Sequence, residues 1–268
     1  MLKKKSLLKR GFAVCFLAKA ILCFSQTDEK KLAALACPWT PDSSHYEISY
    51  YKPAYDNCIK RLEEGLAKKS GCDLIFLGDT FVEGLELYPE ILKKYFSSNI
   101  PLNLSVSGDL TQNVLYRLEN PDMEKLKPKF VVLMVGAFNN LAKPDDTAKG
   151  ITTIFEKIKK LWPESSIIFV SIPPVSGGYE KVNEKIQKEA NGKNIFYLDL
   201  VQAMNDAGGF NKLSPDGMRF KEEGYNLFAD NLSKKLAQAK SQSMFKKINK
   251  SPAKPAPAKN QPKNKTKK

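Results

Sequence analysis

The sequence predicts an α/β protein: a three-layer α/β/α arrangement with a doubly wound sheet of about five parallel strands, in a single domain. Short apolar runs of strand length recur along the chain, and stretches with helical spacing separate them. The runs KFVVLMV and IIFVSI are apolar at almost every position, which is typical of strands buried on both faces. With 42% hydrophobic residues, the 268-residue chain can build one sizeable core.

The first half of the domain contains two expected strands. A helix over 58–69 (CIKRLEEGLAKK) precedes the strand DLIFLG at 73–78. A helix over 86–96 then leads to a short strand at 101–106. The next helix, over 111–119, begins at a threonine, a residue type that favours helix starts.

The second half continues the alternation. Each expected strand is an apolar run, and each expected helix has apolar residues at a spacing of three to four. A regular alternation of this kind favours parallel strands joined by helical crossovers. The strands are expected at 129–136, 165–174 and 194–200, and the helices at 147–162, 179–190 and 222–239.

The formal net charge of +14 is concentrated at the two ends of the chain. Residues 1–25 contribute +6 and residues 241–268 contribute +9, which leaves −1 for residues 26–240. A nucleic-acid-binding domain normally carries its positive charge on a folded face. The distribution therefore argues against a nucleic acid as the partner.

The N-terminus, residues 1–25, is predicted to be a signal peptide. The positive stretch MLKKKSLLKR precedes the apolar stretch GFAVCFLAKAILCFS, and the small residues Cys23 and Ser25 suit a cut before Gln26. Lys19 interrupts the apolar stretch, so a short uncleaved membrane anchor stays open as an alternative. A signal peptide predicts a secreted, periplasmic or cell-envelope protein.

Two further segments flank the domain expected at 57–240. Residues 26–56 are polar and contain several prolines, so we expect a leader that packs on the domain. Residues 241–268 are rich in lysine, proline, alanine and asparagine, and they have too few apolar side chains to offset the entropy of ordering. We expect a disordered basic tail, which either aids solubility or tethers the protein to an anionic membrane or envelope surface.

Three cysteines remain after the predicted cut. In an oxidising compartment Cys37 and Cys58 can form a disulfide, whereas Cys72 opens an apolar strand and is expected to be a buried thiol. No pair of cysteines or histidines has the spacing of a metal site. We therefore expect neither a metal nor a cofactor.

Polar residues gather where the expected strands end, which is where doubly wound sheets bind their ligands. The first such segment is GDT, the second NLSVSGD, the third GAFNN and the fourth SPDGMRF. The side chains in these segments that can support chemistry or binding are Thr80, Ser105, Asn139, Asn140, Asp216 and Arg219.

In their order and spacing, over about residues 72–235, these four segments resemble the SGNH (GDSL-type) hydrolase superfamily, and especially its platelet-activating-factor acetylhydrolase-like branch. The stretches SGDLTQNVLYRLEN and PDGMRFKEEGYNLFADNL match beyond the functional letters. The resemblance implies a flavodoxin-like fold and hydrolysis of an ester or amide by a serine, with an aspartate–histidine pair as the base. The serine N–H, a glycine N–H and an asparagine side chain would hold the oxyanion.

The catalytic positions depart from that pattern. Thr80 stands at the nucleophile position, where its extra methyl group crowds the turn and restricts the rotamer. Arg219 stands at the base position, and a guanidinium neither accepts a hydrogen bond nor loses its proton in proteins. Asp216 keeps the acid position, and we expect it to pair with Arg219.

The oxyanion positions differ as well. Ser105 takes the place of the glycine, so its N–H persists beside a new side chain. The Gly-x-Asn segment becomes GAFNN, which we interpret as one residue longer, and either Asn139 or Asn140 is expected to point inward.

Other residues near the site are expected to be structural. The single histidine, His45, lies in the polar leader and is expected at the surface or at a helix cap rather than as a base. Asp79 is interpreted as a hydrogen-bond acceptor in the turn, and Glu83 as solvated.

Two functions follow from these observations. The first is a secreted SGNH-fold protein that is catalytically impaired or inactive and keeps a pocket for a small acyl-ester or anionic ligand. The alternative is an active secreted hydrolase or deacetylase that uses Thr80 as a slow nucleophile on lipid or cell-envelope glycan esters.

Overall fold

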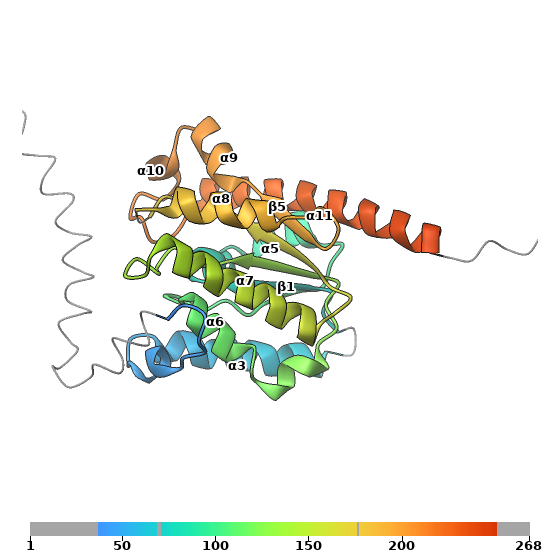
Figure 1. Cartoon of the computed structure of the whole chain (residues 1–268), viewed down its shortest axis with the longest axis horizontal. Helices are drawn as coiled ribbons and strands as arrows, with labels where there is room; N and C mark the ends of the chain where they lie inside the picture. The colour runs from blue at the N-terminus through green and yellow to red at the C-terminus, as the bar shows by residue number, and fades with distance from the viewer. Residues whose placement is uncertain (1–36, 69–70, 176, 251–268) are drawn as a thin grey trace, which may run out of the picture.

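The computed structural model describes residues 37–68, 71–175 and 177–250 (Figure 1), with side chains up to residue 243. The predicted signal peptide and residues 251–268 of the predicted tail lie outside the described residues. Within the described ranges, no helix is long and apolar enough to cross a membrane. No group of three or more acidic, histidine or cysteine side chains there is arranged to hold a metal ion.

Five parallel strands form one sheet in the order β2-β1-β3-β4-β5, which confirms the predicted fold class. Every residue of β1, β3 and β4 is buried, as their unbroken apolar runs predict. The chain moves outward from β1 to β2 and then returns to β3 on the other side of β1. The strand order therefore reverses between β1 and β3, where such sheets place their ligands. The strands are β1 (Leu74–Gly78), β2 (Pro101–Asn103), β3 (Phe130–Met134), β4 (Ser166–Val170) and β5 (Ile195–Leu198).

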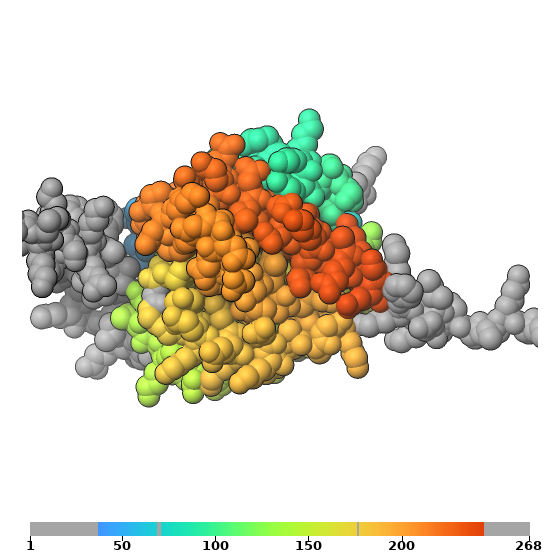
Figure 2. All heavy atoms as spheres, turned by 90° about the horizontal axis from the view of Figure 1, so that it is seen from above, coloured from blue at the N-terminus to red at the C-terminus, as the bar shows by residue number. Residues whose placement is uncertain are grey.

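Helices cover both faces of the sheet. On one face α6 (Thr111–Arg117), α7 (Pro144–Leu161) and α8 (Tyr179–Glu189) lie side by side (Figure 1). On the other face α11 (Glu222–Lys250) runs beside α5 (Pro89–Phe96), as Figure 2 shows from above. The shorter helices lie in the connections, and they are η1 (Ser44–Glu47), α4 (Thr80–Glu83), η2 (Gly84–Leu87), η3 (Pro121–Lys125), α9 (Leu200–Asp206) and α10 (Phe210–Leu213).

The helix before β1, α3 (Lys52–Ala67), begins six residues earlier than the sequence pattern predicts. Pro53 lies in its first turn, where the missing N–H costs nothing and the fixed φ suits a helix. The helix packs beside β2, and Arg61 donates to the carbonyl oxygens of Asn103 (2.6 Å) and Ser105 (2.8 Å).

The last helix corrects the predicted start of the tail. Residues 241–250 continue α11 rather than beginning a disordered segment. The stretch SQSMFKKINK contains only residues that cost little in a helix, and the first proline after it is Pro252.

The described part of the leader packs on the N-terminal end of α6. Thr111 Oγ1 donates to the carbonyl oxygen of Pro38 at 2.8 Å, and Asn113 Nδ2 donates to that of Asp42 at 2.9 Å. The Lys149 ammonium lies 3.8 Å from the centre of the Trp39 ring, which adds a cation–π contact to α7.

A buried ion pair joins the leader to the centre of the domain. Arg117 and Asp109 are both almost completely buried and make a direct contact. Arg117 also donates to Tyr46 Oη (3.0 Å) and to the carbonyl oxygen of Leu104, and it lies 3.5 Å from the carbonyl oxygen of Gly78. Burial raises the pKa of Asp109 to about 6 while Arg117 opposes the shift, so Asp109 is ionised at neutral pH.

The disulfide that the sequence leaves open between Cys37 and Cys58 does not form in the structure: Cys37, Cys58 and Cys72 are all free. Cys58 lies on the buried side of α3, where its thiol contacts the carbonyl oxygen of Leu104 at 3.4 Å. Burial raises the pKa of this thiol, which makes it a poor nucleophile. Cys72 is buried, as predicted.

Removal of Arg117 tests the importance of the buried ion pair. We expect Arg117→Ala to lower the free energy of unfolding by about 3–5 kcal/mol, because it leaves the Asp109 charge buried and unpaired. Urea unfolding followed by circular dichroism measures the change. The matched control is Lys157→Ala, which breaks the exposed pair with Glu119 and is expected to cost less than about 1 kcal/mol. Equal losses in the two variants would contradict this account.

Candidate functional site

The turn after β1 presents Thr80 at the carboxyl edge of the sheet. Asp79 caps α4, and its Oδ1 accepts a hydrogen bond from the Phe81 N–H at 3.1 Å. Gly78 must be glycine here, because a Cβ would lie 2.3 Å from the carbonyl oxygen of Met134 on β3. The segment GDT therefore stands at the β1–β3 switch point, where the sequence predicts it.

The Thr80 hydroxyl accepts a hydrogen bond from the Gly108 N–H at 2.8 Å. The residue is only 4% exposed. Within the described chain, no group accepts a hydrogen bond from this hydroxyl. Thr80 therefore has no base in contact to take its proton.

Gly108, and not Ser105, supplies the N–H next to Thr80. The Ser105 N–H donates to Asn103 Oδ1 at 3.0 Å, so the predicted oxyanion role of Ser105 does not fit the structure. Gly108 has φ of +81°, and a Cβ there would lie 2.4 Å from the Tyr51 ring. The sequence did contain a signal for this role, which the prediction missed: Gly108 is the glycine of SGD, and a glycine in a polar loop often adopts positive φ.

The two predicted asparagines do not point at Thr80. The Asn139 side chain caps α6: its Oδ1 accepts from the Thr111 N–H at 3.1 Å and its Nδ2 donates to Gln112 Oε1 at 3.1 Å. Asn140 is exposed. The predicted inward amide is therefore absent from this position in the described structure.

Phe138, rather than the predicted Asn139 or Asn140, packs against the residue that follows Thr80. Its ring stacks on Phe81, the residue after Thr80, with centroids 6.0 Å apart and planes 16° from parallel. If GAFNN is aligned without an inserted residue, the Asn of Gly-x-Asn falls on Phe138. This alignment, made without an insertion, would have indicated from the sequence that no asparagine stands at this position. A phenyl ring has no N–H to offer an oxyanion.

Arg219 is held by Glu83 and Ser107. Its Nη2 lies 3.3 Å from Glu83 Oε2 and 2.9 Å from Ser107 Oγ, and Ser107 Oγ donates to Glu83 Oε2 at 2.9 Å. These three residues link the segment before α11 to α4 and to the loop after β2. The prediction that Glu83 is solvated is wrong, because its side chain is only 20% exposed.

Asp216 does not make the predicted side-chain pair with Arg219. It is exposed, and its Oδ1 accepts from the backbone N–H groups of Met218 (2.9 Å) and Arg219 (3.1 Å). This is the geometry of an aspartate that orders its own turn. The aspartate of the family pattern is therefore present, but its side chain does not contact the side chain of Arg219.

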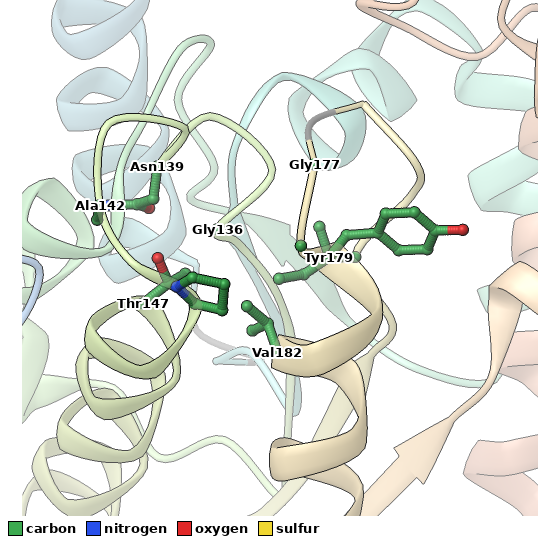
Figure 3. A pocket seen from close by; sticks show the side chains of 10 residues that line it. Gly136, Asn139, Ala142, Thr147, Gly177, Tyr179 and Val182 are labelled. Atoms are coloured by element: carbon green, nitrogen blue, oxygen red, sulfur yellow. The ribbon is translucent and has the colours of Figure 1, made fainter.

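A cluster of aromatic rings surrounds Phe81, the residue after Thr80. Phe81 packs against Phe220 and Phe210, with centroids 4.9 Å and 6.0 Å away. A nearby hollow at the ends of β3 and β4 is lined in part by Gly136, Asn139 and Thr147, and the Tyr179 ring points away from it (Figure 3). Its volume of about 10 Å³ suits at most one water molecule, so an acyl group would have to bind outside this hollow.

Asp79 is fully buried, and its Oδ2 has no hydrogen-bond partner among the described residues. Burial raises the pKa of Asp79 to about 8. The carboxyl group is therefore mostly protonated at neutral pH. It acts as a turn cap, as predicted, and a protonated acid is not a general base.

His45 lies closer to the site than its place in the leader suggests. Its ring stacks on Tyr51 with centroids 3.7 Å apart, and its Nε2 lies 3.2 Å from where a Cβ of Gly108 would stand. Burial lowers the pKa of His45 to about 4, with Asp42 opposing, so the ring is neutral at pH 7. Nε2 is buried and has no partner in the described chain, and it makes no hydrogen bond to Thr80.

The turn after β1 presents the Thr80 hydroxyl to a glycine N–H at the switch point of the sheet. A comparison with known families agrees with this geometry. The pattern of the GDSL-like lipase/acylhydrolase family matches residues 76–227. This chain belongs to the GDSL-like lipase/acylhydrolase family. The assignment confirms the predicted superfamily.

Curated relatives agree with this family assignment. The chain is 34% identical over 143 residues to platelet-activating factor acetylhydrolase IB subunit alpha2 of Bos taurus and of Homo sapiens, which is 52% of this chain and 61% of each relative. It is 35% identical over 102 residues to subunit alpha1 of Rattus norvegicus, which is 38% of this chain and 44% of the relative. The matched region thus spans less than two thirds of the relatives.

Solved structures share the fold. A protein from Streptococcus pneumonia superposes with a TM-score of 0.57 at 17% identity, over 70% of this chain and 94% of its own. A lipase/acylhydrolase from Enterococcus faecalis superposes with a TM-score of 0.50 at 20% identity, over 61% and 95%. At these identities the likeness shows the fold alone.

The state of Asp79 predicts a pH dependence of stability. Because the folded-state pKa of about 8 lies above that of an unfolded aspartate, Asp79 stabilises the protein below about pH 4, and this contribution is lost as the pH rises toward 8. Asp79→Asn keeps the cap oxygen and cannot ionise. We expect the wild type to lose stability relative to Asp79→Asn between pH 4 and 8, measured by urea unfolding at several pH values. A constant difference across this range would show that Asp79 is ionised in the folded protein.

Proposed function

We propose that this protein is a non-hydrolytic member of the GDSL-like family, in which the former esterase site recognises a ligand without turning it over. The observation that carries the proposal is the state of Arg219. It occupies the base position, holds a permanent positive charge and is bound to Glu83 and Ser107.

The chemistry of acyl transfer supports this proposal. A hydroxyl nucleophile needs a neighbouring base, and loss of the serine or histidine of a triad removes about 10⁶-fold in rate. Thr80 contacts an N–H donor and no acceptor, and its neighbour Asp79 is mostly protonated at neutral pH. Of the oxyanion positions that the resemblance implies, the Ser105 N–H is bound to Asn103 and Phe138 has no amide to offer.

The ligand we propose is a small acyl ester or another small anionic molecule. The Arg219 guanidinium is the donor that would recognise a carbonyl or a negative charge, and the Gly108 N–H is a second donor once it exchanges its bond to Thr80. Arg219 is 42% exposed on its side chain, so a ligand can reach it from solvent in exchange for the contact with Glu83. The names of the curated relatives make an acetyl ester the first candidate.

The alternative, an active hydrolase that uses Thr80, is favoured by one observation. His45 Nε2 is neutral, buried and unpartnered in the described chain, and it lies next to Gly108. A movement of the leader that brought His45 to the Thr80 hydroxyl would supply a base. This alternative makes His45 essential, whereas the non-hydrolytic proposal does not.

An esterase assay distinguishes the two proposals. We expect the full chain to hydrolyse short-chain nitrophenyl esters no faster than Thr80→Ala and His45→Gln, within about twofold, because none of these residues takes part in turnover. The double change Thr80→Ser, Arg219→His restores the nucleophile and the base and is expected to raise the rate. Thr80→Ser alone is the matched control, because it restores the hydroxyl without the base. Wild-type turnover that disappears in both Thr80→Ala and His45→Gln would establish the alternative.

We further propose that the protein is exported and that its basic C-terminus contacts an anionic membrane or envelope surface. The support is the composition of residues 1–25 and 241–268, together with α11, whose end extends beyond the sheet (Figure 1). Co-sedimentation with anionic vesicles tests the contact. Binding that persists undiminished after deletion of residues 241–268 or in high salt would contradict it.

A further inference from the structure

A second cavity lies apart from Thr80. It is a cleft of about 300 Å³ between α3, the end of α6 and η3. Ligand pockets begin at about this size, and a buried apolar cavity of about 150 Å³ is enough to bind benzene. The cleft is therefore large enough for a small organic molecule.

The floor of the cleft is apolar, and the polar groups in it already have partners within the protein. Leu62, Leu104 and Met123 line it, and each is at most 3% exposed. The two polar groups there are already bound: Cys58 Sγ contacts the carbonyl oxygen of Leu104, and Arg117 is bound to Asp109. Since Asp109 neutralises Arg117, the floor suits an apolar group rather than an anion.

The outer part of the cleft carries hydrogen-bonding groups. Tyr55 and Tyr116 are half-buried in its wall, and neither hydroxyl has a hydrogen-bond partner among the described residues. Tyr55 is held in place by stacking on Tyr46, with centroids 4.1 Å apart and planes 15° from parallel. Glu119 is also part of the lining, and its side chain is 48% exposed.

We propose that this cleft binds a small amphiphile, with an apolar body in the floor and a neutral or positively charged hydrogen-bonding head near Tyr55 and Tyr116. At about 30 Å³ for each small group, the volume holds a body of about ten non-hydrogen atoms. Glu119 is paired with Lys157 at 3.4 Å, but of the two residues only Glu119 lines the cleft, so its carboxylate disfavours a carboxylate or phosphate head. The site is separate from the one proposed around Thr80.

Tryptamine and indole-3-acetate are matched probes for this proposal, because they share one ring system and carry heads of opposite charge. Met123 offers a reporter inside the floor of the cleft. With the full chain labelled at its methionine methyl groups, we expect tryptamine to shift the Met123 resonance in NMR spectra and to saturate at or below about 1 mM, a range typical of ligands this small. Indole-3-acetate is expected to bind at least about fivefold more weakly, and Met123→Leu assigns the resonance.

Two variants localise the binding. Ile59→Trp fills the cleft from α3 and is expected to abolish the shift, whereas Leu141→Trp, on an exposed side chain elsewhere, is expected to leave it unchanged. Tyr116→Phe removes only one hydroxyl, so it folds with little risk and is expected to weaken tryptamine binding about two- to tenfold.

Three results would overturn the proposal. The first is a Met123 resonance that neither probe shifts at about 10 mM, well above the range in which such small ligands bind. The second is a shift that survives Ile59→Trp with unchanged affinity. The third is a dimer in sedimentation that dissociates in Ile59→Trp, because a second copy of the chain, rather than a small molecule, would then occupy the cleft.

Discussion

The contact between Arg117 and Asp109 is the interaction on which the geometry of the site depends. A buried ion pair is stable only when its charges and remaining donors are satisfied, because removing ions from water costs several kcal/mol each. Arg117 meets this condition through Asp109, Tyr46 and the carbonyl oxygen of Leu104. The same contacts fix the loop after β2, and Gly108, which precedes Asp109, is thereby held against Thr80.

The groups that hold the fold differ from the groups that would perform catalysis. The buried ion pair, the Asp79 cap and the glycines at 78 and 108 hold the turn after β1 and the loop after β2 in place. Arg219 contributes little to the stability of the fold. The Arg219–Glu83 pair is partly exposed, and such pairs contribute about 0–1 kcal/mol. The scaffold can therefore persist under the proposed replacement of the functional positions by Thr80, Phe138 and Arg219.

Much of the fold follows from local patterns in the sequence. Each strand is a short apolar run bounded by polar or glycine residues, and the segments that end β1 and β3 lie at the switch point because parallel strands end at one edge. The extent of α11 was harder to predict. Residues 241–250 show no clear helical spacing of apolar residues, although their residue types are compatible with a helix.

The side-chain directions in the loops were less predictable. Asn139 and Phe138 are neighbours, and which of them faces Thr80 depends on the backbone path after Gly136, where φ is +116°. Likewise the sequence points to Ser105 as the donor, but the Ser105 N–H is taken by Asn103 two positions earlier. Gly108, packed against Tyr51 from the distant leader, supplies the N–H instead. The partner of Arg219 lies 136 positions away at Glu83, beyond the reach of any local pattern.

The central claim is that the Thr80 hydroxyl is not activated, and covalent labelling tests it most directly. A fluorophosphonate reacts with a hydroxyl only when a base makes that hydroxyl nucleophilic. Intact-mass measurement of the full chain after incubation is predicted to show unmodified protein, while the Thr80→Ser, Arg219→His variant gains one adduct. A stoichiometric adduct on Thr80 of the unaltered protein, mapped by peptide mass spectrometry, would contradict the account.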